Sequence, residues 1–85
     1  GITSPVSRNE IAKVQIQGEP NTQYTIEVHY SSGISKAEGL ESKTSDSDGY
    51  VGWEWKIGGK TKPGTYKVVI KSNTGDSKQT EITVK

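Results

Sequence analysis

The sequence contains no cysteine, no methionine and no phenylalanine among its 85 residues, and it has only one leucine and two alanines. Without cysteine, the chain has no disulfide, no thiolate nucleophile and no zinc–thiolate site. Because leucine, alanine and methionine favour helices, their scarcity argues against a helical fold. Isoleucine, valine and threonine supply 24 residues instead, and β-branched side chains fit the pleated surface of a sheet. The composition therefore predicts an all-β protein.

The chain also lacks a strong charge and a long apolar run. Eleven basic and ten acidic residues give a formal net charge of +1, which is too small to mark a nucleic-acid-binding surface. No segment has the pattern of a membrane helix or of a signal peptide. Leucine, isoleucine and valine total only 16 residues, but disorder usually also requires a large net charge. We therefore expect a folded domain that binds no nucleic acid, does not insert into a membrane and carries no cofactor.

The length corresponds to one domain. Gly1, directly before Ile2, is interpreted as a cloning remnant, so we expect residues 1–85 to be a single domain excised from a longer chain. We expect this domain to be a monomer whose main partners are the adjacent domains of that chain.

Alternating apolar and polar residues, separated by turn signals, predict seven short strands. They are expected at residues 2–6, 10–17, 23–30, 40–44, 50–57, 65–71 and 77–85. Pro5 places the first of them at a sheet edge, and residues 36–38 fit one helical turn. The spacing of the turns is typical of an antiparallel β-sandwich. An odd number of strands predicts that the two chain ends emerge at opposite poles.

The strongest local pattern is the turn and strand at residues 61–70. Within it, Gly64, Tyr66 and Val68 form a Gly-x-Tyr-x-Val run that resembles the tyrosine corner of immunoglobulin-like (Ig-like) sandwiches. In that motif the tyrosine hydroxyl anchors a loop by bonding to the backbone upstream. Val68 stands where an antibody domain carries its second cysteine. The resemblance implies structural roles for these three residues.

Residues 46–72 as a whole resemble the bacterial Ig-like modules of surface and secreted multidomain proteins. The matching features are Asp48-Gly49, the alternation of Trp53, Trp55 and Ile57, and the tyrosine corner. The resemblance implies a seven-stranded antiparallel Ig-like β-sandwich that serves as a non-catalytic spacer, presentation or adhesion unit of an extracellular or cell-surface protein. Both Ig cysteines are missing and the tryptophan pair lies on a later strand, so a fibronectin type III-like arrangement stays open.

Three aromatic residues are candidates for ligand contact. Trp53 and Trp55 share one face of a strand, where they would either stack on sugar rings or fill the core. Their phase with Val51 and Ile57 favours the core, because a chain without phenylalanine needs large apolar side chains. Tyr50 is out of phase with the pair and is expected to be exposed. The alternative function is a carbohydrate- or cell-wall-polymer-binding module that uses Tyr50, Trp53 and Trp55.

Two polar features are candidates for metal binding and catalysis. Asp46 and Asp48 resemble the opening of a calcium loop, but the position of the bidentate glutamate holds Ile57, and turn chemistry also explains Asp48-Gly49. His29 is the single histidine, and no nucleophile motif accompanies it. We therefore expect neither a metal site nor an enzyme.

A group of lysines is predicted around the tryptophan and tyrosine-corner strands. Such a group would meet an anionic wall polymer or nucleic acid, or it would only protect the strands from edge-to-edge pairing. Its members are Lys56, Lys60, Lys62, Lys67 and Lys71.

Overall fold

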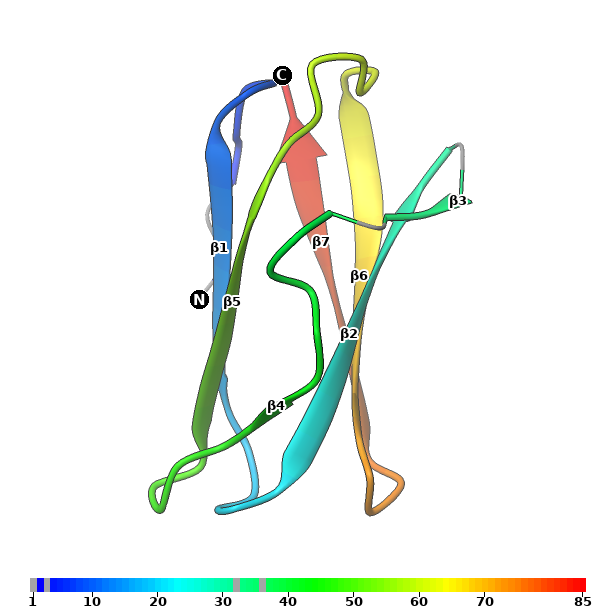
Figure 1. Cartoon of the computed structure of the whole chain (residues 1–85). Helices are drawn as coiled ribbons and strands as arrows, with labels where there is room; N and C mark the ends of the chain where they lie inside the picture. Colours follow the sequence, from blue (N-terminus) through cyan, green and yellow to red (C-terminus); the bar gives the residue numbers. More distant parts are fainter. Residues whose placement is uncertain (1, 3, 32, 36) are drawn as a thin grey trace.

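The computed structural model describes residue 2 and residues 4–31, 33–35 and 37–85, in which there are seven strands and no helix (Figure 1). The all-β prediction is therefore confirmed for these residues. In order, the strands are β1 (Ile11–Gln17), β2 (Gln23–Tyr30), β3 (Gly33–Ile34), β4 (Lys43–Thr44), β5 (Tyr50–Lys56), β6 (Gly64–Ser72) and β7 (Ser77–Val84). Nowhere do the described residues form a helix with the length and apolarity needed to cross a membrane.

The strands form two antiparallel sheets. The smaller sheet is the ribbon β1–β5, and the larger has the order β3-β2-β6-β7, with β4 also paired to β2. Figure 1 shows the ribbon lying opposite the larger sheet. The chain passes from one sheet to the other after β1, before β5 and after β5, so the two layers are interlinked rather than built one after the other.

One hydrophobic core lies between the two sheets. Trp53 and Trp55 of the ribbon are only 1% and 2% exposed, which confirms that the indoles are core residues. Alternation along each strand directs one set of side chains inward. The core cluster comprises Val6, Ala12, Val14, Tyr24, Ile26, Val28, Val51, Trp53, Trp55, Ile57, Val68, Ile70, Ile82 and Val84.

The predicted corner forms at the start of β6. The Tyr66 hydroxyl donates to the Lys62 carbonyl oxygen at 2.5 Å, and the Tyr66 ring meets the Tyr30 ring edge-on, with centroids 5.0 Å apart. Val68 is fully buried. Gly64 lies against the Tyr66 phenol, and an added Cβ would sit 3.5 Å from the hydroxyl oxygen. The bond from the Tyr66 hydroxyl to the backbone upstream is the contact that was expected of this tyrosine.

The strand expected at residues 2–6 does not form a regular strand. It is reduced to two isolated bridges, an antiparallel one between Ile2 and Val14 and a parallel one between Val6 and Val84. Pro5 has no N–H to donate, which interrupts a regular ladder at this point. The prediction of opposite poles also fails for the described residues, because Ile2 bridges Val14 at the middle of β1 and does not lie at the pole away from Val84.

Residues 31–43 differ most from expectation, and Ser32 and Lys36 lie outside the described residues. Gly33 and Ile34 pair with β2 as a short strand that was not among the seven expected. The expected strand at 40–44 is reduced to β4, and a turn rather than a helix precedes it. Gly39 has a φ of 95°, and a Cβ at this position would collide with the Glu54 carbonyl oxygen. Close packing on β5 therefore shapes this segment.

We expect Tyr66→Phe to lower the free energy of unfolding by about 1–2 kcal/mol, because the variant loses the bond to the Lys62 carbonyl. Tyr50→Phe is the matched control, since the Tyr50 hydroxyl has no partner among the residues that the structure describes. Denaturant unfolding followed by tryptophan fluorescence measures both variants. Equal losses in the two would contradict an anchoring role for the Tyr66 hydroxyl.

Gly49 and Gly75 provide a matched pair of turn glycines, with φ angles of 88° and 102°. Alanine at either site should cost about 1–2 kcal/mol for the left-handed conformation. At Gly49 the new Cβ would also collide with the Gly18 carbonyl oxygen, whereas nothing lies within 4 Å at Gly75. Gly49→Ala should therefore lose about 1–3 kcal/mol more than Gly75→Ala in the same unfolding measurement, and similar losses would refute the close contact.

Candidate functional site

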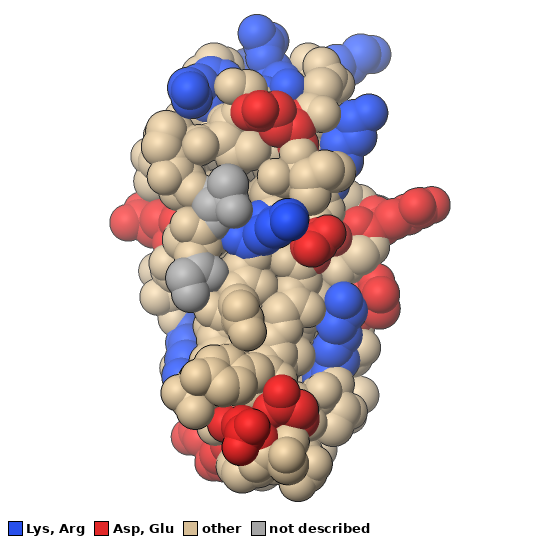
Figure 2. All heavy atoms as spheres, turned by 90° about the vertical axis from the view of Figure 1, so that its left-hand side faces the viewer, with Lys and Arg blue, Asp and Glu red and all other residues tan. Residues whose placement is uncertain are grey.

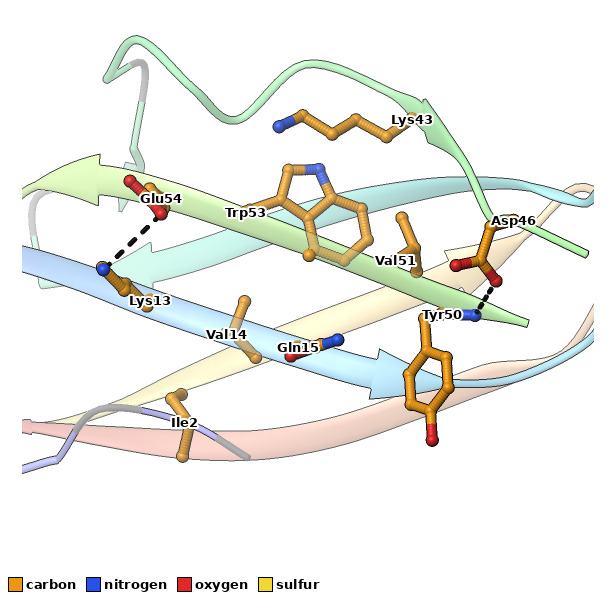
Figure 3. Close-up of a pocket in the computed structure, with 11 residues that line it drawn as sticks. Ile2, Lys13, Val14, Gln15, Lys43, Asp46, Tyr50, Val51, Trp53 and Glu54 are labelled. Carbon is orange, nitrogen blue, oxygen red and sulfur yellow. Dashed lines mark hydrogen bonds and ion pairs between the residues drawn. The ribbon is translucent and has the colours of Figure 1, made fainter. Parts of the chain in front are cut away.

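A hollow of the described residues lies over the outer face of the β1–β5 ribbon. It is open to solvent and has a volume of about 790 Å³. Figure 2 views the molecule from this side and shows charged groups of both signs around an uncharged area. The hollow is lined by Ile2, Lys13, Val14, Gln15, Lys43, Asp46, Tyr50, Val51, Gly52, Trp53 and Glu54 (Figure 3).

The register between β1 and β5 determines which side chains lie next to one another on the floor of this hollow. Gln15 lies opposite Gly52, and Gln17 lies opposite Tyr50. Gly52 has no side chain, so the surface is lowered between Tyr50 and Glu54. A Cβ on Gly52 would sit only 3.0 Å from the Val14 carbonyl oxygen, so cross-strand packing also favours glycine here.

The charged side chains of the hollow form only weak ion pairs with one another. Lys13 Nζ lies 3.7 Å from Glu54 Oε1, and both side chains are about two-thirds exposed, so the pair contributes little to stability. Asp46 Oδ1 accepts the backbone N–H groups of Asp48 and Tyr50, each at 2.9 Å. The hollow therefore offers positively charged donors and negatively charged acceptors beside one phenol, and neither sign of charge dominates.

The structure separates the three aromatic candidates. Tyr50 is 44% exposed, and Figure 3 shows its ring on the opposite side of β5 from Trp53. The indole N–H of Trp53 donates to the Glu41 carbonyl oxygen at 2.9 Å, and that of Trp55 donates to the Tyr30 hydroxyl at 3.2 Å. The idea of an indole platform is therefore wrong, because both rings are buried, and Tyr50 alone is placed to contact a ligand.

The predicted calcium residues form a turn. Asp46 caps it through its carboxylate, and the Asp48 carbonyl accepts the Gln17 side-chain amide at 3.1 Å. Across residues 2, 4–31, 33–35 and 37–85, no group of three or more His, Cys, Asp or Glu side chains is close enough to hold a metal ion. The turn thus uses the carboxylate of Asp46 but only the backbone N–H and carbonyl of Asp48.

His29 lies on the outer face of the larger sheet. Its Nε2 is 3.4 Å from Glu27 Oε1, and Lys71 Nζ approaches the same oxygen at 3.9 Å. This arrangement is a partly exposed charge cluster, and no hydroxyl group of the described residues joins it.

The predicted lysines belong to three consecutive segments of the chain. They divide among the end of β5, the β5–β6 loop and the exposed positions of β6, in the order Lys56, then Lys60 and Lys62, then Lys67 and Lys71. The sequence could not place them relative to one another, because their positions depend on which strands pair.

Sequence reasoning missed the hollow itself. Gln15 and Lys43 belong to it through the pairing of β1 with β5 and the path of the chain before β5. The one signal in the sequence was Gly52, because glycine inside a strand often marks a close approach of another group.

No protein-family model matches this sequence, and no curated protein matches it either. The fold and the geometry of the hollow are therefore the observations from which a function is inferred.

Removal of calcium should leave the melting temperature unchanged, because the Asp46 carboxylate already accepts two backbone N–H groups in the turn. A ligand that binds only the folded state must stabilise it. Thermal unfolding with calcium and with a chelator, at equal ionic strength, measures the difference. A rise with calcium that Asp48→Asn abolishes would reinstate the metal site.

Proposed function

We propose that this domain is a non-catalytic Ig-like β-sandwich module, which spaces or presents neighbouring domains in a bacterial extracellular or cell-surface protein. The observation that carries the proposal is the hydrogen bond from the Tyr66 hydroxyl to the Lys62 carbonyl. It reproduces the anchoring contact of the tyrosine corner at the start of a central strand.

The strand order supports the same proposal. The larger sheet places β2, β6 and β7 in the order of the C, F and G strands of an Ig sandwich, and the ribbon pairs β1 with β5 as B pairs with E. β3 then corresponds to an added C′ strand. β4 pairs with β2 rather than with β5, which departs from the constant-type order and favours a fibronectin type III-like variant.

The shape and the core support the proposed role as a spacer or presentation unit. The domain is elongated, with extents of 36 × 19 × 19 Å, and a single core ties both sheets together. Its partners in this proposal are the adjacent domains of the same chain, and the domain itself is a monomer.

The spacer role is tested by placing the domain between a donor and an acceptor fluorescent protein. A flexible Gly/Ser linker of the same length is the control, with an expected end-to-end distance of about 50 Å. The folded domain should give a narrower distribution of transfer efficiencies than the linker, with a higher mean. This distribution should change only when the denaturant reaches the unfolding midpoint of the domain. A distribution as broad as that of the linker below the midpoint would refute the proposal.

A second candidate is a carbohydrate- or wall-polymer-binding module. It is favoured by one observation, the exposed ring of Tyr50 at the rim of the hollow on the ribbon. A rigid ring beside mixed hydrogen-bonding groups suits a sugar, because the ring covers the apolar face of the sugar while the polar groups meet its hydroxyls.

Co-sedimentation with insoluble polysaccharides and purified cell walls tests this candidate. Tyr50→Ala should abolish retention, whereas Ile11→Ala, at another exposed position of the same ribbon, should leave it unchanged. If the wild-type domain stays in solution with every polymer, the binding candidate is excluded and the spacer proposal is unaffected.

A further inference from the structure

A second hollow lies beside the tyrosine corner, away from the ribbon face. Its volume is about 470 Å³. Its lining comes from the end of β2, the β5–β6 loop and the start of β6, and Figure 1 shows that loop at the upper pole of the molecule. It is lined by Tyr30, Ser31, Gly58, Lys60, Thr61, Lys62 and Tyr66.

Tyr30 brings a hydroxyl whose proton is not used within the described residues. The oxygen accepts the indole N–H of Trp55 at 3.2 Å, and no acceptor for the hydroxyl proton lies among the described side chains and backbone. Burial of the phenol raises the pKa of Tyr30 above its usual value, and the hydrogen bond from Trp55 lowers it by a smaller amount. The phenol therefore stays protonated at neutral pH and can donate a hydrogen bond into the hollow.

Two lysines provide positive charge at the same place. Lys60 and Lys62 are exposed, and neither forms an ion pair with a described carboxylate. Figure 2 shows that basic side chains gather toward this pole. Among the described residues, no acidic one lines the hollow.

The loop that carries these lysines is held in place. The Thr61 N–H donates to the Gly58 carbonyl at 3.1 Å, and the Tyr66 hydroxyl fixes the Lys62 carbonyl. The Lys62 side chain is free of this contact, because only its backbone is engaged. A fixed loop lowers the entropy cost of positioning the two charges around a ligand.

We propose that this hollow is a binding site for a single oxyanion group, a carboxylate, sulfate or phosphate carried by a larger ligand. Tyr30 donates a hydrogen bond to the anion, and Lys60 and Lys62 neutralise its charge. Charge-assisted hydrogen bonds are stronger than neutral ones, and the two lysine ammonium groups repel cations from the site. The site is independent of the carbohydrate-binding candidate, since it shares no residue with the ribbon hollow.

The two indole N–H groups give an internal reporter and control. Trp55 bonds directly to Tyr30, whereas Trp53 bonds to the Glu41 carbonyl. The protein is titrated with sodium sulfate, which replaces sodium chloride so that the ionic strength stays constant, and two-dimensional ¹H–¹⁵N spectra are recorded. The indole N–H signal of Trp55 should move until the site is saturated, whereas the signal of Trp53 should not move. Phosphate and glucuronate should also shift the Trp55 signal, and neutral glucose should not. Comparison of the affinities for sulfate, phosphate and glucuronate then identifies the preferred oxyanion.

The variants separate a built site from general attraction of anions. Tyr30→Phe keeps the ring and should weaken sulfate binding about fivefold, and Lys60→Gln with Lys62→Gln should weaken it about tenfold. Lys43→Gln removes one charge from the other hollow and should bind as the wild type does. The lysine variants change exposed side chains, so they report on binding even if Tyr30→Phe is unstable. A Trp55 shift that does not saturate, or that saturates at the wild-type sulfate concentration in the double lysine variant, would overturn the proposal.

Discussion

Burial of the two indoles between unequal sheets is the constraint on which this fold depends. A two-stranded ribbon is marginal in water by itself, so β1 and β5 hold their shape because Trp53 and Trp55 pack against the larger sheet. Each indole can bury roughly 150–250 Å². In a chain without phenylalanine or methionine, these two side chains supply much of the volume that closes the core.

Burial of an indole also requires a partner for its N–H group, and the two partners explain features that lie far from the ribbon. The bond from Trp53 to the Glu41 carbonyl holds the irregular segment before β4 against β5. The bond from Trp55 to Tyr30 fixes a phenol that in turn meets the ring of Tyr66. One core requirement thus orders both the covering loop and the aromatic cluster at the corner.

The sequence predicted the parts of the fold that local patterns determine. Strong alternation located β1, β2, β5, β6 and β7, and the phase of β5 correctly separated the exposed Tyr50 from the buried tryptophans. It failed where contacts distant in sequence decide the outcome. Gly39 turns because its backbone packs on Glu54, and neither hollow is visible before the strands are paired, since each is lined by residues from several segments.

The parallel pairing of the first segment with the last strand has a mechanical consequence. The Val6 N–H donates to the Thr83 carbonyl at 2.9 Å, and the Lys85 N–H donates to the Val6 carbonyl at 3.0 Å. These two bonds lie across the strand direction, and the segments that they join run the same way. A tension that draws the first segment and β7 apart along their length would load both bonds in shear, so they must rupture together rather than unzip one at a time.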